Sequence, residues 1–150
     1  KMEVLLDLYS NLDINQALIY CNTKRRVLEL EKTMNEKDFV VSAMHGEMDQ
    51  MKRDTIMKEF RTGATRVLIT TDLLARGIDV QGITHVINYE LPRSPKDYIH
   101  RIGRTGRAES PGEAISLIVP NDEHHFKIIK KKMKIWIELI ETADFDLHGY

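Results

Sequence analysis

The sequence has 150 residues, of which 42% are hydrophobic and 30% charged, a composition typical of one soluble globular domain. The 22 basic and 23 acidic residues give a formal net charge of −1, so binding of a polyanion must depend on local clusters of positive charge. Apolar runs reach only about six residues, far below the roughly 20 that span a bilayer. The single cysteine cannot form an internal disulfide, and no export signal is visible. We therefore expect an intracellular protein without a membrane segment.

Short β-branched apolar runs alternate with longer stretches of helical periodicity. Strands are predicted, in chain order, at Ala17–Cys21, Phe39–Met44, Val67–Thr70, His85–Asn88 and Ala114–Val119. Lys24–Glu36 and Met51–Arg61 place apolar residues at helical spacing. The lysine-rich run Lys127–Lys134 predicts an amphipathic helix whose lysines are either solvated or in contact with RNA. This alternation predicts an α/β fold, with a mostly parallel sheet and helices on both faces.

Polar residues follow four of the predicted strands directly. They are Asn22-Thr23, His45-Gly46, Thr71-Asp72 and Tyr89-Glu90. In an open parallel sheet the ligand crevice lies beyond the carboxyl ends of the strands. We therefore expect the functional site at these four strand ends.

The strongest chemical signal is the segment His100–Arg107, which reads His-Arg-Ile-Gly-Arg-Thr-Gly-Arg. Its three arginines, at intervals of three residues, present planar guanidinium groups, and its two glycines let the backbone approach a ligand closely. An isolated arginine at a helix end is usually solvated. Eight consecutive residues of this composition favour phosphate binding instead.

Two further segments place polar groups at strand ends. The segment Val67–Asp72 contains a predicted strand followed by Thr-Asp, and Leu73–Asp79 adds an arginine, a glycine and a carboxylate. This pattern predicts either a ligand site or a capped helix start. Tyr20–Arg26 joins polar side chains to three adjacent cations, and Thr23 either caps a helix or contacts a ligand.

The segment His45–Arg53 combines a glycine with a predicted helix start. Asp49 is the expected N-cap, and Arg53 lies in the first turns of the helix that follows. Because a helix N-terminus attracts anions, this segment also favours phosphate.

No phosphate-binding loop of the form G-x-x-x-x-G-K-[ST] and no Asp-Glu-Ala-Asp occurs in the sequence. The glycines Gly77 and Gly82 have the loop spacing, but Ile83 follows in place of lysine. Asp122–His125 superficially resembles an acidic metal-binding motif. We interpret it as an acidic helix start, because adjacent histidines cannot share a helix face as metal ligands do. No metal site is predicted.

The chain from Gln16 to Val119 resembles the second half of DEAD-box ATP-dependent RNA helicases in nearly every segment. Leu18–Arg26 matches motif IV of that family, His45–Arg53 motif IVa, Val67–Val80 motif V and His100–Arg107 motif VI. The stretch up to Gly77 is similar to the translation-initiation-factor branch, whereas Arg107-Ala108-Glu109 and Pro120–Phe126 look closer to bacterial-type members. The resemblance implies that residues 1–150 form one C-terminal RecA-like domain, without the N-terminal ATP-binding lobe.

The resemblance also implies residue roles. Arg104 and Arg107 match catalytic arginine fingers, which contact ATP together with Gly77 and Asp79. His100 and Arg101 match residues that link this lobe to the other. The residues that match contacts to the RNA backbone are Asn22, Thr23, Gly46, Arg53, Thr71 and Arg76.

For the whole protein, the resemblance implies a monomer that uses ATP with Mg²⁺, bound mainly by the N-terminal lobe. Its partner is single-stranded RNA, held without sequence specificity because contacts to phosphate and 2′-hydroxyl groups carry little base information. The isolated domain should not hydrolyse ATP. Two alternatives remain, a stand-alone RNA-binding or scaffold module and a DNA-directed superfamily 2 motor lobe. The motif VI arginines argue against a stand-alone binding module, because such a module needs no group that contacts the γ-phosphate. The residues of motifs V and VI favour an RNA helicase over a DNA-directed motor.

Overall fold

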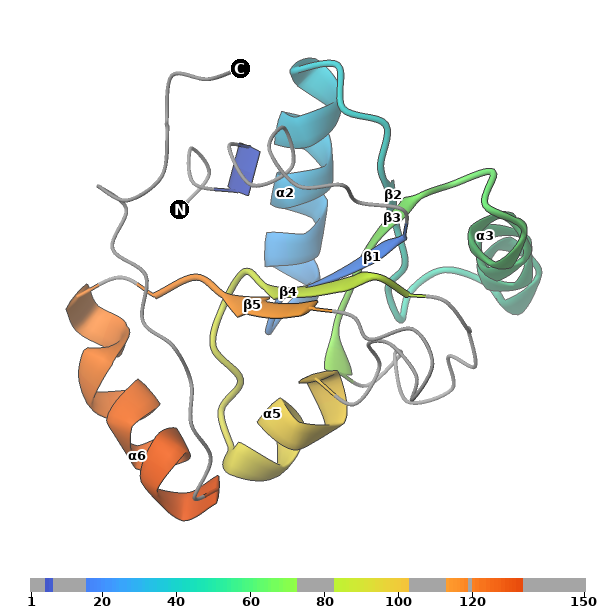
Figure 1. The fold of residues 1–150 in the computed structure, drawn as a ribbon. Coiled ribbons are helices and arrows are strands. Elements are labelled where there is room, and N and C mark those ends of the chain that lie inside the picture. Colours follow the sequence, from blue (N-terminus) through green and yellow to red (C-terminus); the bar gives the residue numbers. More distant parts are fainter. Residues whose placement is uncertain (1–4, 7–15, 73–82, 103–112, 119, 134–150) are drawn as a thin grey trace.

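The computed structural model describes residues 5–6, 16–72, 83–102, 113–118 and 120–133. Within them one parallel sheet has the strand order β2-β3-β1-β4-β5. Its strands are β1 (Ala17–Tyr20), β2 (Ser42–Ala43), β3 (Val67–Thr70), β4 (His85–Asn88) and β5 (Glu113–Ser116). The helices are α2 (Lys24–Glu36), α3 (Gln50–Thr62), α5 (Pro95–Ile102), the short 3₁₀ helix η1 (Pro120–Asp122) and α6 (Glu123–Met133). Figure 1 shows this arrangement, which confirms the predicted α/β class.

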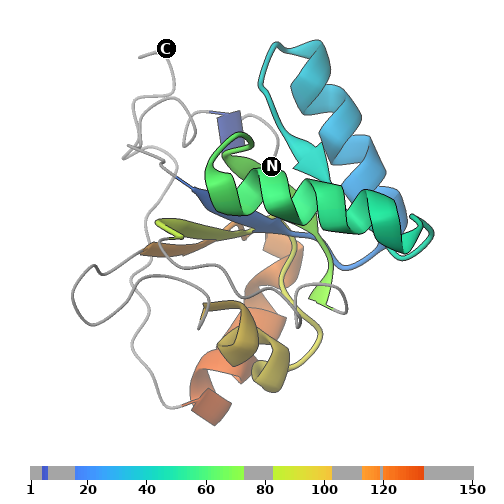
Figure 2. The same cartoon turned by 90° about the vertical axis from the view of Figure 1, so that its right-hand side faces the viewer.

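The central strands are buried on both faces because successive side chains point to opposite sides of the sheet. Figures 1 and 2 show α2 on one face of the sheet and α3 on the other. One core cluster joins alternate strand residues to α2: Ile19, Ile69 and Ile87 with Val27, Leu30 and Met34. The other joins the intervening residues to α3: Leu18, Leu68 and Val86 with Met57 and Phe60. The near-continuous apolar strands are therefore explained by two covered faces.

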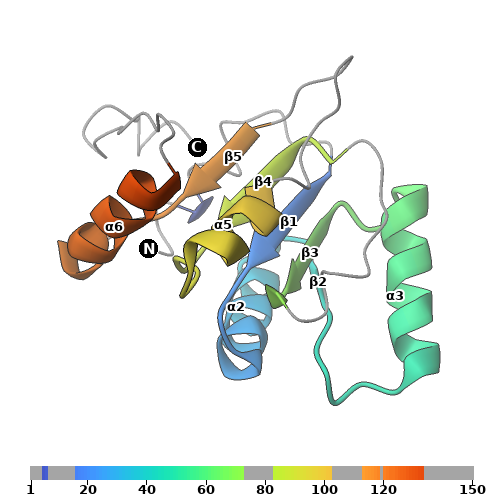
Figure 3. The same cartoon turned by 90° about the horizontal axis from the view of Figure 1, so that it is seen from below.

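A third cluster connects α5 to α6, which lie beside each other in Figure 3. Tyr98 of α5 packs with Leu91, and both contact Phe126 and Ile129 of α6. The ring Nε2 of His125 lies 2.8 Å from the carbonyl oxygen of Pro92. Pro92 is in the β4–α5 connection, so α6 supports the segment that leads into motif VI. None of the described helices has the length and apolar character required to cross a bilayer.

Both predicted helix caps are present. The Thr23 side chain accepts a hydrogen bond from the backbone N of Arg26 at 3.2 Å, and Asp49 accepts one from the backbone N of Lys52 at 2.8 Å. Each cap satisfies a donor that the first helical turn leaves unpaired. Likewise α6 begins at Glu123, as expected for an acidic helix start.

The second strand is shorter than predicted. The sequence pattern predicts Phe39–Met44, but only Ser42–Ala43 pairs, and it pairs with β3 alone at the sheet edge. Asp38 takes a left-handed conformation, with φ of 67°, and the backbone N of Phe39 donates to the carbonyl of Met34. These residues therefore complete the end of α2 and cannot extend the strand. At the opposite edge, β5 spans Glu113–Ser116 where Ala114–Val119 is predicted, and Val119 lies outside the described residues.

Gly63 ends α3 in the left-handed conformation, with φ of 84°, and its backbone N donates to the carbonyl of Phe60. A Cβ at this position would meet no atom within 4 Å, so Gly63→Ala changes backbone strain and not packing. We expect this substitution to lower the free energy of unfolding by about 1 to 2 kcal/mol. Urea unfolding followed by circular dichroism measures the effect.

Gly46→Ala is the matched control for this substitution. Gly46 also has open space where a Cβ would lie, but its φ is not positive. Its replacement should leave stability unchanged or raise it by up to about 1 kcal/mol. Equal losses in the two variants would contradict the assigned backbone geometry.

Candidate functional site

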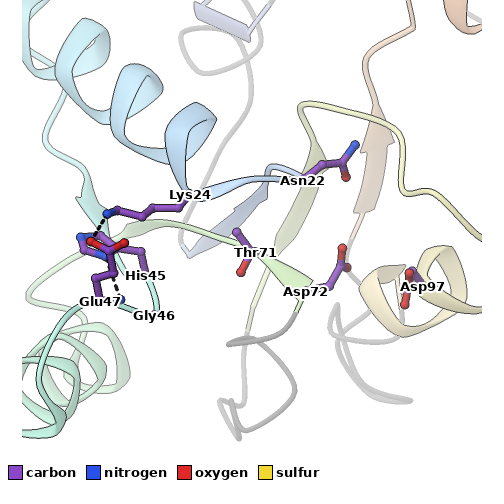
Figure 4. A pocket seen from close by; sticks show the side chains of 8 residues that line it. All are labelled: Asn22, Lys24, His45, Gly46, Glu47, Thr71, Asp72 and Asp97. Carbon is purple, nitrogen blue, oxygen red and sulfur yellow. Dashed lines mark hydrogen bonds and ion pairs between the residues drawn. The ribbon is translucent and has the colours of Figure 1, made fainter.

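The carboxyl ends of β1, β2 and β3 meet at one edge of the sheet, where a hollow of about 440 Å³ opens. It is lined by side chains from the segments that follow these strands and from the start of α5: Asn22, Lys24, His45, Gly46, Glu47, Thr71, Asp72 and Asp97. Figure 4 shows the arrangement of these residues. The structure therefore brings together Asn22, Gly46 and Thr71, three of the residues predicted to contact RNA.

Beneath this edge lies the side chain of Arg101, which is fully buried. Its Nε and Nη2 donate to the two carboxylate oxygens of Asp72, both at 2.7 Å, in a bidentate ion pair. Nη2 also donates to Oδ1 of Asn22 at 2.7 Å. Nη1 donates to the carbonyl oxygen of Glu90 at 2.7 Å and to Oδ1 of Asn88 at 3.3 Å. All five guanidinium donors thus have acceptors.

These contacts join the segments that follow β1, β3 and β4 to the last turn of α5. The guanidinium carbon lies 5.0 Å from the ring centroid of Tyr20, within the range of a cation–π contact. Burial of a charge is costly unless it is paired and hydrogen-bonded, and both conditions are met here. Arg101 therefore connects the segments that follow these strands and fixes their positions beside the hollow.

The two residues predicted to link this lobe to another lie in contrasting environments. His100 is exposed on α5 and is accessible to a second domain. For Arg101 the resemblance predicts an interdomain contact, but its guanidinium group has no donor left over. A direct role for Arg101 between the lobes stays a prediction, and its contacts in this structure support an organising role within one lobe.

Asn22 is also engaged inside the lobe. Its backbone N donates to Oε1 of Glu90 at 3.0 Å, and its Nδ2 donates to the carbonyl of Leu91 at 2.8 Å. With Oδ1 bound to Arg101, one N–H of the side-chain amide has no partner among the residues that the structure describes. Glu90 also lies 3.6 Å from Nε of Arg26 through its other oxygen. Sequence reasoning places Glu90 at a strand end but does not indicate that it supports Asn22.

Two 13-residue helices begin beside the hollow. Lys24, the first residue of α2, lines it directly, and the loop that holds Gly46 leads into the N-cap of α3. The N-terminal ends of helices carry partial positive charge and unpaired N–H groups, so both helix starts favour an anion. On α3, Nε of Arg53 is buried without a hydrogen-bond partner among the described residues. Because this atom is buried and Arg53 is not among the residues that line the hollow, phosphate binding by Arg53 stays a prediction.

An ion pair crosses the rim of the hollow between Lys24 and Glu47. The hydrogen bond and charge of Lys24 hold the pKa of the Glu47 carboxyl below its ordinary value, with a smaller effect from His45. The backbone N of Glu47 donates to Nδ1 of His45 at 3.3 Å. The sequence gives no signal for this ion pair, because Lys24 begins α2 whereas Glu47 lies in the loop before α3, 23 residues further along the chain.

Five predicted site residues lie outside the described part of the chain. They are Arg76, Gly77, Asp79, Arg104 and Arg107. Thr23, by contrast, is described and exposed, and its hydroxyl oxygen serves as the cap of α2 while remaining at the surface.

Known proteins share both the sequence and this fold. Residues 1–109 match the family model described as the helicase conserved C-terminal domain. The chain is 55% identical over 147 residues to eukaryotic initiation factor 4A of Cryptosporidium parvum, covering 98% of this chain and 36% of that protein. The likeness to an initiation factor therefore extends beyond the first half of the chain.

Two solved structures show the same architecture. The C-terminal domain of the DEAD-box protein Dbp5 aligns with a TM-score of 0.86 and 36% identity, covering 97% of this chain and 86% of that one. Dbp5 of Saccharomyces cerevisiae bound to RNA and ADP BeF3 aligns with a TM-score of 0.88 and 36% identity, covering 95% of this chain and 39% of that one. The chain belongs to the helicase conserved C-terminal domain family and is a RecA-like domain of the DEAD-box type. It spans little more than a third of the length of the initiation factor it matches.

Removal of the buried guanidinium group should destabilise the whole strand-end region. Arg101→Met leaves the Asp72 carboxylate and three further oxygens without their donor, and we expect a loss of about 3 to 5 kcal/mol in the free energy of unfolding. Arg93→Met, at an exposed arginine in the preceding loop, should change it by less than about 0.5 kcal/mol. Urea unfolding of both variants measures the difference, and equal midpoints would show that the network does not form.

Proposed function

We propose that this chain is the C-terminal lobe of an ATP-dependent RNA helicase, in which it supplies part of the RNA-backbone site and the arginine fingers. The observation that carries this proposal is the convergence of Asn22, Gly46 and Thr71 with two helix N-termini on one hollow at the strand ends. Free amides, hydroxyl groups and helix N-termini recognise phosphate and ribose without reading bases. The complex of the similar Dbp5 with RNA and ADP BeF3 supports the same ligand class here.

RNA lies with its backbone against Gly46, Thr71 and the start of α3 in this proposal. Thr71 is partly exposed on the hollow, and Thr23 presents its hydroxyl at the start of α2. Arg53 contributes its guanidinium group to a phosphate, and Arg76 adds a second cation. Because no contact reads a base edge, binding is independent of sequence.

ATP binds between this lobe and an ATP-binding lobe on the same protein. Gly77 and Asp79 contact the nucleotide, and Arg104 and Arg107 stabilise charge on the γ-phosphoryl group as it is transferred to water. Mg²⁺ is held mainly by the other lobe, because this sequence contains no phosphate-binding loop. His100 meets the other lobe when the two close around RNA and nucleotide. A protein that acts on RNA with ATP works inside the cell, and we expect it to act as a monomer.

The nucleotide half of the proposal is tested by hydrolysis assays. The 150-residue chain alone should show no ATPase activity above background, whereas joining it to an ATP-binding lobe should produce activity stimulated by RNA. Arg104→Ala in the joined protein should lower turnover by about a thousandfold or more, as loss of an arginine finger does elsewhere. The exposed Arg93→Ala is the control and should retain activity. Turnover by the isolated chain, or stimulation by DNA as strong as by RNA, would contradict the proposal.

The RNA half is tested by a substitution that leaves the fold intact. A methyl group at Gly46 meets no protein atom within 4 Å, so Gly46→Ala blocks only a ligand that approaches the backbone. We expect affinity for single-stranded RNA, measured by fluorescence anisotropy, to fall about fivefold or more, equivalent to about 1 kcal/mol.

Gly63→Ala provides the reciprocal control, because it strains the opposite end of α3 without entering the hollow. It should lower stability and leave RNA affinity of the folded protein unchanged. Unchanged RNA affinity in Gly46→Ala would place the RNA elsewhere.

A further inference from the structure

Lys24 and Glu47 connect the start of α2 to the loop before α3 at the rim of the hollow. Nζ of Lys24 donates to Oε2 of Glu47, and Figure 4 shows the two side chains meeting between the start of α2 and the loop before α3. Both side chains are accessible, with exposed fractions of 38% and 74%. They line the same hollow as Gly46 and Thr71, so a ligand on that surface meets the ion pair directly.

The charge of the hollow depends on this contact. Among the described lining residues, Lys24 is the only lysine or arginine, whereas Glu47, Asp72 and Asp97 are acidic. The charge of Asp72 is compensated from below by Arg101, but Glu47 occupies the one ammonium group that faces the hollow. A phosphate that binds Lys24 therefore competes with the carboxylate for the charge and the N–H donors of one ammonium group.

We infer that Glu47 competes with RNA phosphate for Lys24 and thereby limits the affinity of this lobe for RNA, an inference that rests on the proposed function. When phosphate takes Lys24, the Glu47 carboxylate loses its partner and stays beside a second anion. The exchange replaces one anion by another at the ammonium group. Because salt dependence arises from counterions released as cations neutralise phosphates, the Lys24 contact adds little to it while Glu47 is present.

A weak contact on this lobe has a functional consequence. Two linked sites that bind weakly one at a time hold a ligand tightly only when both engage it. Glu47 therefore makes firm RNA binding depend on the closed arrangement of two lobes, and opening of the lobes releases the strand.

Affinities of the 150-residue chain for single-stranded oligouridylate, measured by fluorescence anisotropy over a series of salt concentrations, test this inference. Glu47→Gln should tighten binding about two- to fivefold at low salt. It should also steepen the dependence of log affinity on log salt by about 0.7. Lys24→Gln removes the contested cation, so Glu47→Gln should have no effect in that background.

Glu29→Gln is the matched control. Glu29 pairs with Arg25 and Arg26 on α2, away from the residues that line the hollow, and its replacement should change neither affinity nor salt slope. Unfolding midpoints of all variants should coincide, because every changed side chain is accessible.

The outcomes separate this inference from the proposed function. An equal gain from Glu47→Gln with and without Lys24 would show a general field effect and overturn the competition. Weaker binding by Glu47→Gln would show that the carboxylate itself contacts RNA, and this result would also overturn the competition. RNA binding by the wild-type chain with no response to Glu47→Gln would overturn this inference alone. Failure of every variant to bind RNA at low salt would overturn the proposed function and the inference with it.

Discussion

The bidentate ion pair between Arg101 and Asp72 is the contact on which the strand-end region depends. A fully buried guanidinium group requires every donor to be paired, and the five acceptors come from Asn22, Asp72, Asn88 and Glu90. Because these residues follow or end three different strands, a single side chain determines how their loops lie. The buried side of the hollow is therefore fixed by this network, whereas its rim is formed by Lys24 at the start of α2 and by the loop before α3.

This division between buried floor and exposed rim explains the chemistry available at the site. The charge of Arg101 is used within the lobe, so cations for a phosphate must come from Lys24, from Arg53 on α3 and from segments outside the described residues. A net charge of −1 and acidic neighbours keep the hollow from attracting polyanions strongly. In the proposed two-lobe RNA motor, one lobe alone needs only a weak, sequence-independent contact with RNA.

The fold could be predicted from sequence to a large extent because it follows from local patterns. Apolar strand runs and helix caps at Thr23 and Asp49 act over a few residues, and β1, β3, β4, α2 and α3 lie within a residue of the expected bounds. The short β2 could not be predicted, because the left-handed turn at Asp38 ends α2 without a glycine. The placement of Asn22, Gly46 and Thr71 at one edge follows from parallel topology. The pairing of Arg101 with Asn22 does not, because 79 residues separate them and only the folded sheet brings them together.

In the proposed function, the RNA backbone binds at the strand-end hollow and not elsewhere on the lobe. Nuclear magnetic resonance titration of the ¹⁵N-labelled chain with single-stranded oligouridylate tests it most directly, since each backbone amide reports its own environment. We expect chemical-shift changes to concentrate at Thr23, Gly46, Thr71 and the first turn of α3, while the amide resonances of the lysine-rich α6 stay unchanged. Shifts confined to α6, with none at Gly46 or Thr71, would contradict it.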